Sequence, residues 1–429
     1  MSIAPKTLTS LARWHFVIAT LFEGAKYLHQ IGLFLILAPH QYGLLGTTFS
    51  IAYLCATLAG LEHGTALVPH LAAITNNPSG AHYLNRSFLI PQLIQHSVAS
   101  LAASYGILTI TKIPSLAIAG GIIAFGEGIR CSLRPLVYAA TKHHRSAQIE
   151  AAISYCYILS MWLLWIINPA TLTVTLLTQA YAATSLLGVL YLFYRSKSAI
   201  ISHYNQDTAT HNQPSLPTRR ELLATQLSLI VINLPHNLFS ANFIVPFCAY
   251  HGGLKVAGAL KITSEIAGAI KTILKSSIGF PLNAYAQTIQ TIQARRSLLI
   301  GIAQATLPLR IVLGAAVFVA ILAFIIPLPL YTKIVFLGFC LLIGADYLCM
   351  PYELMSIHTN TTIQIAGIRT TEVILDSIIM IIFFKWPLAL LAGISLTRLV
   401  AWQVMAHKPE RPALFFAALW CALKRITTQ

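Results

Sequence analysis

The sequence predicts an all-α, polytopic membrane protein whose twelve transmembrane helices form two six-helix lobes around a central cavity. Of its 429 residues, 56% are hydrophobic and only 9% are charged, and the mean hydropathy is +0.72. A helix needs about 20 apolar residues to cross the hydrocarbon core, and such segments recur along the whole chain. The predicted spans are residues 11–37, 43–72, 85–110, 114–140, 147–168, 171–195, 221–249, 252–280, 296–325, 330–356, 364–385 and 387–406.

Short connections marked by proline or asparagine join the predicted spans on the external side of the membrane. Turns this tight leave no room for an extracellular domain. The predicted external turns are Pro39-His-Gln-Tyr, Thr111-Lys-Ile-Pro, Asn168-Pro, Pro327-Leu-Pro and Trp386-Pro.

Basic residues gather in the alternate connections and at both ends of the chain, as the positive-inside rule expects of cytoplasmic segments. We therefore predict that both termini are cytoplasmic, which agrees with an even number of spans. The net charge of +16 reflects this topology, and we expect no nucleic-acid partner. The basic residues assigned to the cytoplasmic side are Lys6, Arg13, Arg86, Lys142, Arg145, Arg195, Lys197, Arg219, Arg220, Arg295, Arg296, Arg369, Lys408, Arg411, Lys424 and Arg425.

A polar stretch in the middle of the chain divides the spans into six and six. Residues 196–220 are rich in Ser, Thr, Asn, Gln and Pro, which cannot bury a core. Pro135–Ile149 also aligns with Pro351–Ile365 at a constant offset, and two parallel repeats are typical of transporters. The predicted parts are an N-terminal lobe (1–198), a cytoplasmic linker (199–220), a C-terminal lobe (221–406) and an amphipathic cytoplasmic tail (407–429).

Sequence motifs for cofactor or metal chemistry are absent. The seven cysteines have no CxxC spacing, and the histidines have neither HExxH nor Cys/His ligand spacing. There is no Walker sequence and no dinucleotide fingerprint. We expect no metal, no cofactor and no enzymatic activity.

Charged residues inside the apolar spans mark a candidate anion site, because intramembrane charges usually face a protein interior or a cavity. Three spans carry seven bases against three acids, an excess that suits a phosphate or diphosphate group. The alternative is that the charges pair, as Glu127 with Arg130 and Lys261 with Glu265. The candidate diphosphate-binding residues are Lys26, Arg130, Arg134, Lys261, Lys271 and Lys275.

Acidic residues in the second half suggest a separate site for a coupling ion. Glu372 and Asp376 are four apart, so they share one helix face, and carboxylates beside Asn or Thr oxygens can bind Na⁺ or carry a proton. Asn237 and Thr397 are candidates to complete this site. A salt bridge to Arg369 or Arg398 is the alternative.

Two stretches resemble the bacterial polysaccharide flippases of the O-antigen (Wzx) type. One is residues 32–71, with Tyr42-Gly43 after the first span and Gly60-Leu61 near the end of the second. The other is the end of the fourth span, Arg134-Pro135-Leu-Val-Tyr-Ala-Ala, followed by a basic turn. These flippases belong to the multidrug, oligosaccharidyl-lipid and polysaccharide exporter superfamily.

The resemblance implies a secondary transporter that moves an undecaprenyl-diphosphate-linked oligosaccharide across the bacterial cytoplasmic (inner) membrane by alternating access. It implies the lipid-linked glycan and the bilayer as partners, with polysaccharide-assembly proteins as further partners, Na⁺ or H⁺ as the coupling ion, and a monomer. One alternative is a cation-coupled multidrug exporter of the same superfamily. Another is a membrane-embedded glycan polymerase or transferase, which the short external turns disfavour.

Overall fold

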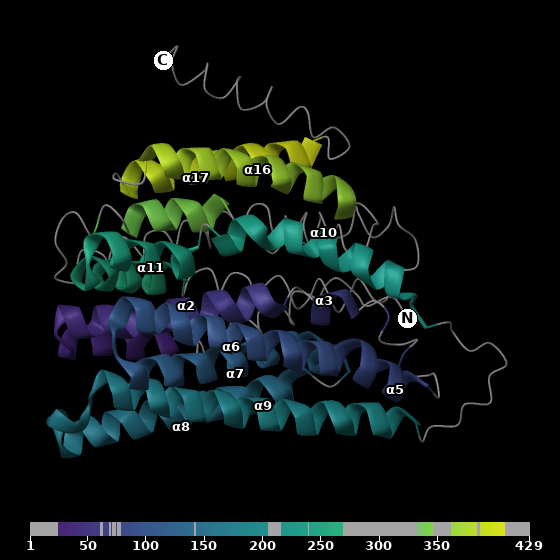
Figure 1. Ribbon diagram of the computed structural model, residues 1–429, viewed down its shortest axis with the longest axis horizontal. Helices are drawn as coiled ribbons and strands as arrows, with labels where there is room; N and C mark the ends of the chain where they lie inside the picture. The colour runs from purple at the N-terminus through teal and green to yellow at the C-terminus, as the bar shows by residue number, and fades with distance from the viewer. Residues whose placement is uncertain are drawn as a thin grey trace, which may run out of the picture. The chain divides into compact units, whose positions relative to one another are not determined.

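A computed structural model of the chain describes residues 25–60, 63–67, 70, 74, 79–140, 143–204, 216–238, 240–268, 333, 336–345, 362–383 and 387–407. Every regular element in these ranges is helical (Figure 1). The chain forms two compact units, each described by itself. Unit 2 comprises Leu33–Ile230 and Ser240–Gly258, and unit 1 comprises Met1–Gly32, Val231–Phe239 and Ala259–Gln429. The predicted lobes, 1–198 and 221–406, stay a prediction.

Unit 2 contains the helices that follow the first predicted turn. Five stretches of its described residues are long and apolar enough to cross a membrane, and they coincide with the second to sixth predicted spans. The chain is therefore a multi-pass membrane protein. Its elements are α2 (Pro39–Gly60), α3 (His63–Leu67), α5 (Gly80–Leu84), the π-helix Asn85–Leu89, α6 (Ile90–Thr111), α7 (Pro114–Ala140), α8 (His143–Ile167), the 3₁₀ turn Pro169–Thr171, α9 (Val174–Tyr204), the first part of α10 (Arg219–Leu238) and α11 (Ala241–Gly252).

Two of the predicted turns are confirmed, and each has a local cause. After α6, Lys112 adopts a left-handed conformation with φ of 59°, its N–H donates to the Leu108 carbonyl, and Pro114 begins α7. After α8, the Asn168 side chain accepts a hydrogen bond from the Ala170 N–H at 3.1 Å. Both arrangements satisfy helix-end groups that would otherwise lack partners.

Two helix boundaries differ from the predictions, and one predicted span is divided into two helices. Pro39–Tyr42, predicted as a turn, is the first turn of α2, where a proline fits because that position needs no N–H donor. Helix α9 continues to Tyr204, so the first residues of the predicted linker are helical; no Pro or Gly interrupts them.

The predicted span 221–249 is two helices, α10 and α11, with a bend at Ser240 between them. Pro235 lies inside α10 and Pro246 inside α11, and each removes one helical hydrogen bond. One continuous helix through this region would therefore have fewer backbone hydrogen bonds than a helix without prolines.

Helix α7 is the central element of unit 2, since it packs against α2, α6 and α9. Close packing requires small residues on its surface. A Cβ at Gly126 would lie 2.8 Å from the Ser185 Cβ of α9, and one at Gly128 would lie 2.2 Å from the His96 ring of α6. These glycines serve helix packing, as expected for small residues in membrane helices.

Unit 1 contains α16 (Thr362–Phe383) and α17 (Pro387–His407), which pack on each other. Ile232, from the part of α10 in this unit, joins Ile368, Val400 and Val404 in one apolar cluster. Residues 25–32, 259–268 and 336–345 add further helical segments to the unit.

Candidate functional site: a buried ion network in unit 2

Helix α7 carries three charged residues on one face of an otherwise apolar span. Glu127, Arg130 and Arg134 are spaced by three and four residues, so they line up along the helix. Glu127 and Arg130 are 5% and 4% exposed. Charges are buried to this degree only when they are paired and hydrogen-bonded.

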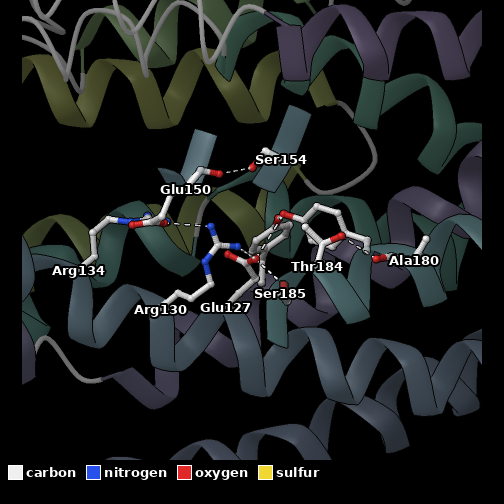
Figure 2. A network of polar contacts seen from close by, with 10 residues as sticks. Glu127, Arg130, Arg134, Glu150, Ser154, Ala180, Thr184 and Ser185 are labelled. Atoms are coloured by element: carbon white, nitrogen blue, oxygen red, sulfur yellow. Dashed lines mark hydrogen bonds and ion pairs between the residues drawn. The ribbon is translucent and has the colours of Figure 1, made fainter. Parts of the chain in front are cut away.

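Glu150, seven residues after the first residue of α8, forms ion pairs with both arginines (Figure 2). Arg130 Nη2 lies 3.0 Å and Arg134 Nη2 lies 2.6 Å from the same carboxylate oxygen, Oε2. Arg134 Nε donates to that oxygen as well, at 3.2 Å. Two guanidinium groups thus converge on one anionic oxygen.

Glu127 connects this pair of arginines to α9. Its Oε1 accepts hydrogen bonds from Arg130 Nη1 at 2.6 Å and from Ser185 Oγ at 2.5 Å, and the Tyr181 hydroxyl lies 3.4 Å away. The Tyr181 and Tyr53 hydroxyls are 2.5 Å apart, which extends the network to α2. Four helices of unit 2 therefore share one polar network.

The network is buried at one end and accessible at the other. The Arg130, Glu127 and Glu150 side chains are 5–7% exposed, whereas the Arg134 side chain is 35% exposed. Among the described residues the network contains two acids and two bases, so their formal charges balance. Of these four charged side chains, that of Arg134 is therefore the most accessible to an anion from outside.

Sequence reasoning missed Glu150, although a signal for it exists. Helix α7 ends at Ala140 and α8 begins at His143, and residue 142 is the midpoint in sequence between Arg134 and Glu150. Residues equidistant from a tight turn between antiparallel helices lie at the same height, so they can pair. The same rule links Asp376 of α16 to Thr397 of α17, because α16 ends at Phe383 and α17 begins at Pro387.

A second buried polar cluster lies within unit 1, on α16 and α17. Glu372 pairs with Arg369 on its own helix, and its Oε1 lies 3.4 Å from Arg398 Nε on α17. The Thr397 hydroxyl donates to Asp376 Oδ1, while Asp376 Oδ2 has no hydrogen-bond partner among the described residues. Glu372, Asp376 and Thr397 of the predicted ion-coupling site are thus brought together, with Glu372 held by arginines.

The other predicted site residues are distributed through the chain. Lys26 is half-buried on the helical residues 25–36, and Lys261 is 3% exposed and pairs with Glu265 at 2.6 Å. Asn237 belongs to α10, but its side chain lies outside the described part of the structure, as do Lys271 and Lys275. Of the six predicted diphosphate residues, the structure brings Arg130 and Arg134 into one cluster.

Two of these bases have the acid partners that the pairing alternative named, Glu127 with Arg130 and Glu265 with Lys261. The third pair, Glu150 with Arg134, was not anticipated from the sequence. In the ranges that the structure describes, no group of three or more His, Cys, Asp or Glu side chains is arranged to hold a metal ion. Both clusters contain ion pairs and hydrogen bonds.

Comparison with solved structures identifies the fold. The chain is similar to an outward-facing multidrug resistance MATE family transporter of the MOP superfamily, with a TM-score of 0.61 and 15% identity over 97% of this chain and 98% of that chain. MATE in complex with MaL6 matches at 0.58, with 15% identity over 96% and 97%, and MATE in the bent conformation at 0.57, with 15% identity over 97% of both chains.

The predicted fold class is thereby confirmed, because MATE transporters are all-α, twelve-helix membrane proteins. No protein-family model and no curated protein sequence matches the chain. The TM-scores of these matches show the fold, and at 15% identity they show the fold alone.

Proposed function

We propose that this protein is a secondary transporter that flips an undecaprenyl-diphosphate-linked oligosaccharide across the bacterial inner membrane by alternating access. The transporter fold supports the general class. The resemblance of residues 32–71 to Wzx-type flippases, together with the excess of bases over acids within three of the predicted spans, supports the anionic substrate. Fold alone does not imply function, so the chemistry of the ion network carries the proposal.

The observation that carries it is the convergence of Arg130 and Arg134 on one oxygen of Glu150. Two guanidinium groups on one anionic oxygen are also the arrangement that binds a phosphate oxygen. Glu150 then occupies an anion site that a diphosphate can take over. Because Arg134 is 35% exposed, the exchange begins there.

This exchange links substrate binding to a helix movement. When a diphosphate binds Arg134, Glu150 loses one of the two cationic partners that the described residues supply, and α8 is held less tightly against α7. A buried charge that loses a partner is costly, so the conformation with Glu150 still buried becomes less favourable. A substrate shifts the equilibrium between two conformations only by the difference in its affinity for them. Displacement of Glu150 from the arginines supplies this difference in affinity.

The coupling ion is proposed to bind at Asp376 and Thr397. Asp376 is fully buried, and its Oδ2 has no partner among the described residues, so a Na⁺ or a proton could satisfy it. Glu372 is engaged by two arginines and serves mainly to fix the cluster. Asn237 remains a candidate ligand, as do Lys26, Lys261, Lys271 and Lys275 for the diphosphate. The cytoplasmic termini, the monomeric state and the polysaccharide-assembly partners also stay predictions.

The test is flipping of a fluorescent undecaprenyl-diphosphate oligosaccharide in proteoliposomes. Arg134→Gln should lower the rate at least about tenfold, because one charge-assisted hydrogen bond to the substrate contributes about 1.5–3 kcal/mol. The matched control is Arg86→Gln, which removes an exposed arginine and should leave the rate unchanged. Equal rates for the wild type and Arg134→Gln would refute the site assignment.

A cation-coupled multidrug exporter is the second candidate, favoured by the buried acids of unit 1 and by the multidrug resistance transporter among the similar structures. Its substrates are lipophilic cations, which the paired arginines of α7 would not bind. Uptake of ethidium by inverted vesicles, without any flipping of the lipid-linked glycan, would favour this alternative.

A further inference from the structure

A second polar cluster of unit 2 lies on the face of α7 that meets α6, apart from the ion network. His96 of α6 is fully buried within a predicted membrane span. Its Nε2 lies 3.0 Å from Gln92 Oε1 and 3.1 Å from Ser132 Oγ of α7. The Ser132 hydroxyl donates to Gln92 Oε1 at 2.6 Å, so Ser132 and Gln92 join α7 to α6 around the imidazole.

The other imidazole nitrogen, Nδ1, is buried and has no hydrogen-bond partner among the described residues. It faces Gly128, where a Cβ would lie only 2.2 Å away. A neutral imidazole with its proton on Nε2 can donate to Gln92 and leave Nδ1 as an empty acceptor. A second proton would place an N–H donor against the α7 backbone without an acceptor, which is costly in a buried site.

We propose that His96 is a protonation switch that holds α6 against α7 while it is neutral and releases this contact when it is protonated. The function goes beyond substrate flipping, because it makes the conformation of unit 2 respond to pH. Once the contact has opened and the ring is hydrated, an imidazole takes up its second proton near pH 6.5, whereas the packed site opposes that proton. The conformation described here is therefore the more populated one at higher pH, and its population falls in acid.

The described titratable and charged groups around His96 do not stabilise its protonated form. On α3, His63 Nδ1 lies 3.1 Å from Gln92 Nε2, so it reaches His96 only through that amide. Glu127 and Arg130 flank Gly128 on α7 but bond to partners on α8 and α9, and Gly60 of α2 faces the ring with no side chain. Glu62 lies outside the described residues, and no described carboxylate pairs with the imidazole.

The start of α6 can absorb the resulting movement. The π-helix Asn85–Leu89 immediately precedes α6, and Pro91 lies at the beginning of that helix. Pro91 has no N–H for the Ser87 carbonyl, so an α-helical ladder is already incomplete here. Single π turns of this kind often accompany functional movement.

Hydrogen–deuterium exchange of the purified full chain at pH 8 and pH 5 tests the proposal, after correction for the intrinsic effect of pH on exchange. Peptides from α6 in the wild type should exchange at least about tenfold faster at pH 5, which corresponds to a tenfold shift in the opening equilibrium. His96→Gln cannot be protonated and should exchange slowly at both values. His63→Gln, the matched control, should retain the wild-type response.

Gly128→Ala provides a second variant, because its methyl group must displace the His96 ring. It should exchange rapidly in α6 at both pH values. A wild-type pH response in either His96→Gln or Gly128→Ala would overturn the proposal, as would an α6 exchange rate in the wild type that does not depend on pH. None of these readouts requires a substrate, so the outcome is independent of the proposed flippase activity.

Discussion

Replacement of Glu150 by glutamine isolates the contribution of its charge, because the side chain keeps its size. Removing one partner of a buried ion pair costs about 3–5 kcal/mol. Arg130 retains Glu127 at 2.6 Å, and the Arg134 side chain is 35% exposed and can be hydrated. We therefore expect the free energy of unfolding to fall by about 3 kcal/mol, the lower end of this range. In a large chain, Tm falls by about 2 °C per kcal/mol, so the expected decrease in Tm is about 6 °C.

Thermal unfolding in detergent, followed by intrinsic fluorescence, measures this change. Inorganic pyrophosphate should raise the Tm of Glu150→Gln more than that of the wild type, because the anion replaces the missing negative charge and stabilises the folded state by mass action. Glu221→Gln is the control: Glu221 is exposed and closes a capping box with Thr218, a role that glutamine also fills. A Tm of Glu150→Gln equal to that of the wild type, or equal stabilisation of both by pyrophosphate, would refute the reasoning.

Three further substitutions test the surrounding structure. Tyr181→Phe removes the hydroxyl that bonds to both Glu127 and Tyr53, and it should lower stability by about 1 kcal/mol or more, measured by the same unfolding assay; an unchanged Tm would mean that both contacts are dispensable. Gly126→Ala places a Cβ 2.8 Å from a side chain of α9 and should cost about 1–3 kcal/mol, again visible in Tm; a neutral effect would argue against tight α7–α9 packing. Thr397→Val removes the hydroxyl that donates to Asp376. It should raise the Na⁺ or H⁺ concentration for half-maximal transport about tenfold, whereas identical ion dependence would exclude Thr397 from the coupling site.

Much of the fold follows from the sequence because the apolar spans and their prolines are local signals. The α7 boundaries, Pro114 and Ala140, agree with the predicted span, and Lys112 with Pro114 accounts for the turn before it. The bend at Ser240 was missed because a proline inside a membrane helix, such as Pro235, is compatible with either a kink or a break. Tertiary packing decides between the two.

The candidate site was only partly predictable for a similar reason. The spacing of Glu127, Arg130 and Arg134 on one helix face is visible in the sequence, and so is the possibility that they pair. Glu150 is twenty residues from Arg130, and its role depends on how α8 folds back along α7. Charge counting over single helices overlooked this acid and therefore overestimated the positive excess around Arg130.

The central claim is that Glu150 occupies an anion site formed by Arg130 and Arg134. Its most direct test is the affinity of the purified protein for inorganic pyrophosphate, measured by calorimetry on the wild type, Glu150→Gln and Arg134→Gln. The account predicts binding that is at least about tenfold tighter in Glu150→Gln and at least about tenfold weaker in Arg134→Gln than in the wild type. Equal affinities in all three proteins would contradict it.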